Sequence, residues 1–255
     1  MNYVRPKKSL GQHFLTDTNI ARKIVNSLTT CSNVLEIGPG KGVLTKIIIE
    51  KNIENFKVIE IDSESVEYLK SNINLKPEQI IFADFLKTDI KSIFENKFSI
   101  IGNFPYNIGS QIFFKVLQNH EQVVEVVCML QKEVAQRIAT KSGSKVYGIL
   151  SVLLQTFYNI EYLFTVNEKV FNPPPKVKSA VIRLTRNNRQ KLECDENLFF
   201  NVVKTSFNQR RKTLSNSLKP VLGGKKIDLP VFLKRPEQLT VDEFIGLTKI
   251  ITSNQ

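Results

Sequence analysis

The chain carries the sequence VLEIGPGKG at residues 34–42. Its first four residues set three apolar side chains around Glu36, a composition typical of a short buried strand. The glycines that follow let the backbone turn sharply and approach a ligand without an intervening Cβ. A helical pattern begins at Gly42, so this stretch predicts a strand, a ligand-holding glycine turn and a helix.

The spacing of the glycines indicates the kind of ligand. They form a G-x-G-x-G pattern from Gly38 through Gly40 to Gly42. The dinucleotide fingerprint needs its third glycine one position later, where this chain has Val43. The spacing therefore argues against NAD and favours a nucleoside cofactor that lacks a pyrophosphate.

Apolar runs and helical patterns alternate around this stretch. Further strands are predicted at residues 56–61, 79–83, 98–102 and 123–130. Helices are predicted at residues 17–28, 42–51, from 63 onward, 110–117 and 132–140. Regular alternation of this kind predicts a doubly wound α/β sheet.

The pattern changes after residue 146. Two strands are predicted at residues 155–166 and 179–185 without a helix between them, so we expect an antiparallel pair at one sheet edge. The intervening FNPPP at 171–175 can form neither a helix nor a central strand. Because the later pattern is helical, we divide the chain into an α/β domain, 1–188, and a small all-α domain, 189–255.

Composition indicates a polyanionic partner. The 255 residues are 42% hydrophobic, enough for a sizeable core, and carry a net charge of +12. Residues 169–227 hold fourteen Lys and Arg against three acidic residues, a net +11. A second basic cluster consists of Arg5, Lys7 and Lys8. Charge this concentrated is typical of a phosphate-binding face, although a merely solvated basic surface is the alternative.

Several classes of protein are disfavoured. Cys31, Cys128 and Cys194 are far apart and form no C-x-x-C pair, so we expect reduced thiols and a cytoplasmic protein. With two histidines in the chain, a four-ligand zinc site or a Ser-His-Asp triad is not expected, and we predict no metal. No apolar run has the length of a membrane span, so we expect no membrane association.

Acidic residues follow the predicted strands on the side where open α/β sheets bind ligands. Glu60 lies 22 residues after Gly38, where a carboxylate can accept both ribose hydroxyls of a nucleoside. Asp62 is the alternative acceptor. Asp84 ends the third strand and could accept from an adenine amino group. The competing interpretation is that these carboxylates only cap the helices that follow.

The tetrapeptide Asn103-Phe104-Pro105-Tyr106 follows the fourth strand. An adenine amino nitrogen is a poor nucleophile, because its lone pair is delocalised into the ring. The Asn103 side-chain oxygen and the Phe104 carbonyl could each accept a hydrogen bond from the amino group and so localise its lone pair on nitrogen. Pro105 stiffens the turn, and Tyr106 could stack on a flipped-out base. The pattern predicts methyl transfer to a base in nucleic acid, against the alternative of a simple strand-ending turn.

Phe171 precedes three prolines, so its position is stiff. It could stack on the opposite face of the flipped base. Core packing at a bend is the alternative.

Taken together, the chain resembles the ribosomal RNA adenine N6-dimethyltransferases of the KsgA type nearly end to end. The resemblance is carried by KKSLGQHFL at 7–15, the glycine turn, the tetrapeptide, FNPPPKV at 171–177 and FNQRRKTL at 207–214. It implies a Rossmann-like S-adenosylmethionine-dependent methyltransferase sheet with a small C-terminal all-α domain that binds rRNA. The segment 1–16 would contact cofactor and RNA.

The resemblance also implies the reaction. The enzyme would dimethylate the N6 amino groups of two adjacent adenosines in the 3′-terminal hairpin loop of 16S rRNA in the 30S particle, with a role in small-subunit biogenesis. We expect it to be a monomer, and we expect three sets of site residues. The catalytic set is Asn103, Phe104, Pro105, Tyr106 and Phe171; the cofactor set is His13, Leu15, Gly38, Gly40, Glu60, Asp84 and Asn103; the RNA-binding set is Arg5, Lys7, Lys8, Lys176, Lys178, Lys204, Arg210, Arg211 and Lys212.

Three positions depart from the family pattern. His13 stands where Asn is frequent, Phe104 where Leu is common, and Lys178 where Asp is usual. Macrolide-resistance methyltransferases acting on 23S rRNA share the glycine turn and the N-x-P-Y motif, and they are the first alternative. The triple proline and the 207–214 motif favour the 16S enzyme. A non-catalytic ribosome-assembly factor on the same fold is the second alternative.

Overall fold

The structure is a computed structural model that describes residues 4–30, 32–53 and 55–254. It divides into two compact units. The first comprises the chain up to Ala135 with Ile160–Arg186, and the second comprises Gln136–Asn159 with the chain from Asn187 onward. The division expected at 188/189 lies close to the last of these boundaries, but Gln136–Asn159 groups with the C-terminal helices.

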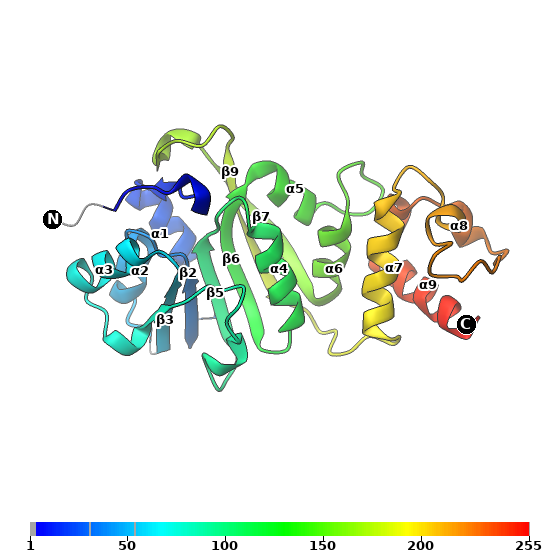
Figure 1. The fold of residues 1–255 in the computed structure, drawn as a ribbon, viewed down its shortest axis with the longest axis horizontal. Helices are drawn as coiled ribbons and strands as arrows, with labels where there is room; N and C mark the ends of the chain where they lie inside the picture. Colours follow the sequence, from blue (N-terminus) through cyan, green and yellow to red (C-terminus); the bar gives the residue numbers. More distant parts are fainter. Residues whose placement is uncertain (1–3, 31, 54, 255) are drawn as a thin grey trace. The chain divides into compact units, whose positions relative to one another are not determined.

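The described residues form a seven-stranded sheet in the order β4-β3-β2-β5-β6-β9-β7 (Figure 1). The strands β2 to β6 are parallel to one another, and β9 runs antiparallel to β6. Their bounds are β2 Asn33–Ile37, β3 Asn55–Glu60, β4 Ile80–Phe82, β5 Phe98–Asn103, β6 Val123–Gln131, β7 Tyr158–Val166 and β9 Ser179–Arg186. The predicted α/β sheet is confirmed, and β9 and β7, the last two strands of the chain in this sheet, form one of its edges.

Helices connect successive parallel strands: α2 Val43–Glu50 joins β2 to β3, α3 Ser63–Asn72 joins β3 to β4, and α4 Gly109–Gln118 joins β5 to β6. Helix α1 Thr18–Asn26 precedes β2, and α5 Lys132–Ala139 follows β6. Asp17 caps α1 by accepting hydrogen bonds from the backbone N–H groups of Asn19 and Ile20, at 2.8 and 3.1 Å. The central strands are covered on both faces, which explains their continuous apolar sequences. Val34, Ile101 and Val127 are accordingly fully buried.

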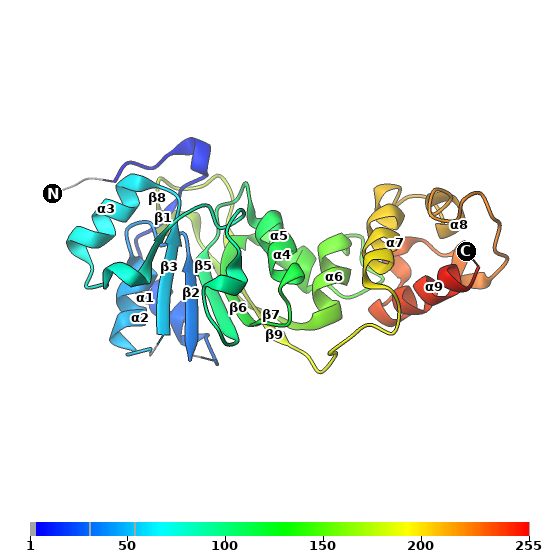
Figure 2. The same cartoon turned by 60° about the horizontal axis from the view of Figure 1, so that its bottom comes forward.

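The second unit is helical, as predicted for the C-terminal part of the chain. It contains α6 Ile149–Phe157, α7 Glu196–Asn208, α8 Leu214–Ser217 and α9 Val241–Ser253. Helix α7 packs against the other three (Figure 2). The Phe207 ring lies 6.2 Å from that of Tyr147 and 6.0 Å from that of Phe244. Short 3₁₀ turns occur at Lys8–Leu10, Pro77–Gln79, Ile90–Ser92, Glu168–Val170, Pro230–Leu233 and Pro236–Gln238.

The strand predicted at 155–166 was wrong at its start. Residues Ile149–Phe157 form the helix α6, and the strand begins at Tyr158. Most of this helix is buried, and the six apolar residues of its sequence ILSVLLQTF are not confined to one face. Such a run lacks the periodicity that separates a buried helix from a buried strand.

A two-stranded antiparallel sheet joins distant parts of the first unit. Strand β1, Phe14–Leu15, pairs with β8, Phe171–Asn172. It attaches the N-terminal segment to the residues before the triple proline. Among the described residues, none of the helices is both long enough and apolar enough to span a bilayer.

We predict that Gly102→Ala destabilises the fold. A Cβ at this position in β5 would lie 2.6 Å from the Ile37 carbonyl oxygen of β2, so the strands would have to move apart. Urea unfolding followed by circular dichroism should show a loss of about 2 kcal/mol. Gly109→Ala is the matched control, because nothing lies within 4 Å of its added Cβ. Equal unfolding midpoints for the two variants would contradict the prediction.

Candidate active site

A cavity of about 300 Å³ opens at the carboxyl ends of β2, β3 and β5. Five segments line it: the N-terminal segment, the glycine turn after β2, the end of β3, residues 83–86 after β4, and the tetrapeptide at the end of β5. Its wall includes Ser9, Gly11, Gln12, His13, Phe14, Gly38, Gly40, Glu60, Ile61, Asp84, Phe85, Asn103, Phe104, Pro105 and Tyr106. The fold thus brings together most of the predicted cofactor and catalytic residues.

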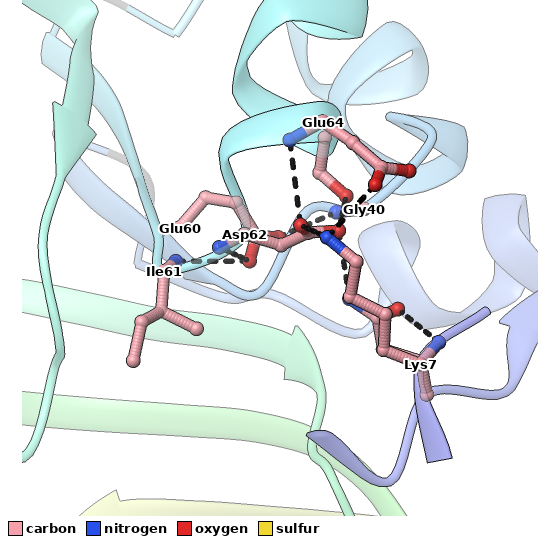
Figure 3. Close-up of polar contacts among 8 residues, drawn as sticks. Lys7, Gly40, Glu60, Ile61, Asp62 and Glu64 are labelled. Atoms are coloured by element: carbon pink, nitrogen blue, oxygen red, sulfur yellow. Dashed lines mark hydrogen bonds and ion pairs between the residues drawn. The ribbon is translucent and has the colours of Figure 1, made fainter. Parts of the chain in front are cut away.

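Glu60 ends β3 with a nearly buried carboxylate. One oxygen accepts hydrogen bonds from the Ile61 and Asp62 N–H groups, both at 2.9 Å, and the other accepts from the Gly40 N–H at 3.1 Å (Figure 3). Burial raises the pKa of this carboxyl, while the three backbone donors act in the opposite direction. A carboxylate offers about four lone-pair sites, so acceptor capacity remains for a ligand hydroxyl.

The glycine turn needs its glycines for two different reasons. Gly38 and Gly40 have left-handed φ values of +65° and +54°, which strain any residue with a Cβ. At Gly40 an added Cβ would also lie 2.7 Å from the Phe14 ring. The side chain of Phe14 therefore packs directly on the turn.

Asp84 follows β4 and is half-buried in the cavity wall. One of its oxygens accepts a hydrogen bond from the Leu86 N–H at 2.9 Å. This bond orients the carboxylate.

Asn103, the last residue of β5, is oriented by the N-terminal segment. Its side-chain amide nitrogen donates to the His13 carbonyl oxygen at 2.9 Å. A carbonyl oxygen only accepts, so the contact fixes which end of the amide is nitrogen. The Asn103 oxygen is then the end available to accept from a ligand.

The side chain of the neighbouring Phe104 is buried, so only the backbone of this residue can contact a ligand in the cavity. The ring packs edge-on against Phe113, with 5.9 Å between the centroids, and the backbone N–H donates to the Met129 carbonyl at 2.9 Å. The change from Leu to Phe at this position is therefore absorbed by the core.

Tyr106 and His13 form an aromatic pair at the cavity, with ring centroids 5.4 Å apart. The Tyr106 hydroxyl lies 2.5 Å from the Ser179 hydroxyl; burial raises the pKa of Tyr106, and this hydrogen bond opposes the shift. The His13 Nδ1 lies 2.8 Å from the Pro173 carbonyl, so Nδ1 carries a hydrogen. In the neutral ring Nε2 is then an acceptor, and it donates only when the ring is charged.

Two predicted residues lie outside this cavity wall. Leu15 and Phe171 face each other across the β1–β8 pair, and both side chains are buried in the apolar core. The structure does not bring the Phe171 ring to the tetrapeptide. Leu15 instead lines a space of about 30 Å³ beside Glu36, Gly38 and Asn103.

The predicted RNA-binding residues differ in their surroundings. Arg5, Lys8, Lys176 and Lys178 are exposed in the first unit, and Lys204, Arg211 and Lys212 are exposed in the second. Arg210 is half-buried, and its guanidinium donates to the Lys145 carbonyl. Lys7 is half-buried, and its ammonium pairs with the carboxylates of Asp62 and Glu64.

Sequence reasoning missed a buried acid. Glu36, in the middle of β2, is 1% exposed, and one of its oxygens accepts a hydrogen bond from the Thr45 hydroxyl at 2.7 Å. Burial raises the pKa of Glu36 to about 8, the Thr45 hydrogen bond lowers it in part, and nearby Glu60 adds a further rise. The signal was visible as the one charged side chain in an apolar strand.

The sequence model of the family described as Ribosomal RNA adenine dimethylase matches residues 4–251. The chain belongs to this family. Ribosomal RNA small subunit methyltransferase A of Parabacteroides distasonis is 58% identical over 254 residues, which cover 98% of this chain and 95% of the relative. Its namesake from Flavobacterium johnsoniae is 57% identical over 258 residues, covering 100% and 98%.

Solved structures agree on the fold. A dimethyladenosine transferase from Plasmodium falciparum has a TM-score of 0.78 at 26% identity, covering 95% of this chain and 98% of that one. The 23S rRNA methyltransferase ErmE has a TM-score of 0.64 at 23% identity, covering 92% and 99%, a likeness of fold alone. The predicted Rossmann-like methyltransferase fold is confirmed, and so is the predicted enzyme class.

Dimethylases of this family use S-adenosylmethionine, and the cavity fits that molecule. A nucleoside needs an acceptor for its ribose hydroxyls, an apolar wall for its purine and a polar group at the purine edge. Glu60, Ile61 with Phe85, and Asp84 supply groups of these kinds. Among the described residues, His, Cys, Asp and Glu side chains form no group of three suited to a metal ion.

We predict that Glu36 makes stability fall as the pH rises. The folded protein holds the Glu36 proton with a pKa of about 8, against 4.5 for the ordinary carboxyl. The stabilising contribution is therefore complete below pH 4.5 and is lost as the pH rises through 8. Glu36→Gln keeps the acceptor for Thr45 but does not titrate. Relative to this variant, the wild type should lose up to about 1.4 kcal/mol of unfolding free energy per pH unit across that window. Denaturant unfolding at several pH values measures the difference, and a constant difference would contradict the prediction.

Proposed function

We propose that this dimethylase acts on the N6 amino groups of two adjacent adenosines in the 3′-terminal hairpin loop of 16S rRNA. Its substrate would be the 30S particle or its precursor, which the protein would meet as a monomer in the cytoplasm during small-subunit biogenesis. The carrying observation is Asn103, whose side-chain oxygen is held as an acceptor at the cavity by the bond from its amide to His13. The relatives named for the small ribosomal subunit support the choice of rRNA.

The cofactor would lie along the ends of β2, β3 and β4. Glu60 would accept a hydrogen bond from a ribose hydroxyl and Asp84 one from the purine amino group, and the open backbone at Gly38 would admit the amino-acid end. Nothing lies within 4 Å of a Cβ built on Gly38, so this side of the turn is clear. His13 presents an acceptor when neutral, which suits the ammonium of a methionine group.

The cofactor supplies an electrophilic methyl group on a positively charged sulfur. The protein's task is to make the adenine amino nitrogen a better nucleophile and to align it. The Asn103 oxygen and the Phe104 carbonyl would each accept a hydrogen bond from the adenine amino group. Pro105 stiffens the turn that carries these two acceptors. Tyr106, fixed by Ser179, would stack on the extruded base.

The first alternative, a resistance enzyme for 23S rRNA, shares this chemistry. The likeness to ErmE concerns the fold, whereas curated relatives at 57–58% identity carry the small-subunit name. Offering purified 30S and 50S subunits with labelled cofactor separates the two targets. Label in 23S rRNA alone would overturn the proposal.

We predict that Asn103→Ala lowers the rate of methylation strongly. Without the amide oxygen, the adenine nitrogen loses one of its two acceptors, and kcat should fall about 100-fold with a smaller change in KM. The assay is label transfer to the 3′-terminal hairpin of unmethylated 30S subunits. Asn119→Ala, which removes the same amide at the end of α4, is the control and should keep wild-type activity.

The same variant tests the second alternative, a non-catalytic assembly factor. Cells carrying Asn103→Ala should accumulate immature small subunits if methylation is the principal task. Normal subunit maturation without methylation would show that binding alone is required.

We predict that the exposed pair Arg211 and Lys212 contacts phosphates. Changing both to Gln should reduce the slope of log K against log salt for RNA binding by roughly two. A filter-binding titration at several salt concentrations measures it. The control changes Lys234 and Lys249 to Gln, because these charges already pair with Glu243 and Glu193 in the same unit. Equal slopes for both double variants would count against this face.

A further inference from the structure

The ammonium of Lys7 is already paired with carboxylates, unlike that of a lysine available to bind RNA phosphates. Its ammonium contacts one oxygen of Asp62 and lies 3.1 Å from an oxygen of Glu64 (Figure 3). The Asp62 side chain is 1% exposed and that of Lys7 is 34% exposed. An exposed pair of this kind would contribute little, but a buried carboxylate that loses its cation is left charged in a poor solvent.

Gln12 adds a second link between the same two segments. Its side-chain nitrogen donates to the other Asp62 oxygen at 3.2 Å, and its side-chain oxygen accepts from the Lys7 N–H at 2.9 Å. Ser65 donates to that Asp62 oxygen at 2.9 Å. Burial alone would raise the pKa of Asp62, but the hydrogen bonds from Lys7, Gln12 and Ser65 hold it below the ordinary value.

The residues between Lys7 and β1 form a strap across the cofactor cavity, which we define as residues 7–15. Residues 9–14 line the cavity. The far end of the strap is fixed by the pairing of Phe14–Leu15 with Phe171–Asn172, and its middle by the bond from Asn103 to His13. The near end is fixed by Lys7 and Gln12 on Asp62.

Asp62 also connects the strap to Glu60. The Asp62 N–H donates to the Glu60 carboxylate at 2.9 Å, while the Asp62 side chain receives Lys7. A single residue therefore carries the near-end attachment of the strap and one of the three donors that orient Glu60. Moving Asp62 would move both.

We propose that Lys7 is a positioning residue for the cofactor: through Asp62 it closes the strap over the cavity and steadies Glu60, and it is not a phosphate contact. The inference rests on the proposed role of Glu60 in holding the cofactor. It reassigns the one member of the basic N-terminal cluster whose charge is already paired with carboxylates.

The test is calorimetric titration of the full chain with S-adenosylmethionine. Lys7→Met keeps the length of the side chain and removes its charge, and it should weaken binding about tenfold, the equivalent of a lost hydrogen bond to a charged group. Lys7→Arg restores a cation and should stay within about threefold of wild type. Lys70→Met removes an exposed, ion-paired lysine of the same region and should leave the affinity unchanged.

Two further readouts separate positioning from a general loss of structure. Trypsin should cleave after Lys8 faster in cofactor-saturated Lys7→Met than in saturated wild type, because the near end of the strap is released. The salt slope of RNA binding by the saturated protein should stay unchanged. Wild-type cofactor affinity in Lys7→Met, or a slope reduced by about one, would overturn the inference.

The variant Glu60→Gln distinguishes a wrong assignment of Lys7 from a wrong assignment of the cofactor site. If Glu60→Gln binds the cofactor as the wild type does, the assignment of Glu60 is wrong and the strap has no target. If Glu60→Gln weakens binding and Lys7→Met does not, the cofactor site stands and only the role of Lys7 is refuted.

Discussion

The Glu60 carboxylate and its three backbone donors are the contact on which the site depends. One donor comes from the glycine turn after β2 and two from the turn after β3, so a single buried group ties two separate loops together. A buried carboxylate without such partners would be costly, so these hydrogen bonds stabilise the acid and the two loops together. Phe14 then packs on Gly40, and the N-terminal segment reaches Asp62 at the other loop. The Glu60 side chain thus joins the two loops, and the N-terminal segment packs on both of them.

Sequence reasoning succeeded where local pattern and topology coincide. Parallel strands buried on both faces read as continuous apolar runs, and the ends of such strands share one edge of the sheet. That is why Glu60, Asp84 and Asn103 could be placed at one cavity from their positions in the chain alone. The G-x-G-x-G spacing of the turn likewise identified the class of ligand.

The failures share a different physical origin. Pairing of Phe14–Leu15 with Phe171–Asn172 joins residues more than 150 positions apart and leaves no local signal. Phe171 and Leu15 were assigned to the site, whereas their side chains lie in the apolar core, because the same apolar side chain suits both places. The ion pairs of Lys7 with Asp62 and Glu64 could not be foreseen either, because composition counts charges but not their partners. Helix α6 was missed because uniform burial removes periodicity.

The distribution of charge around the cavity suggests how a base is admitted and a phosphate excluded. Glu60 and Asp84 lie in the cavity wall, and Glu36 lies buried behind the glycine turn. In a partly desolvated site the carboxylates of Glu60 and Asp84 favour a sulfonium cation and repel a phosphate, over a range of about 8 Å at physiological salt. Glu36, with its pKa of about 8, is mostly protonated near neutral pH and adds little to this field. Two exposed cations are sequence neighbours of residues at the site: Lys8 precedes Ser9 of the wall, and Lys178 precedes Ser179, whose hydroxyl contacts that of Tyr106. An acidic wall of this kind is a poor site for a phosphate, while the aromatic pair of His13 and Tyr106 contributes ring surface to the same cavity.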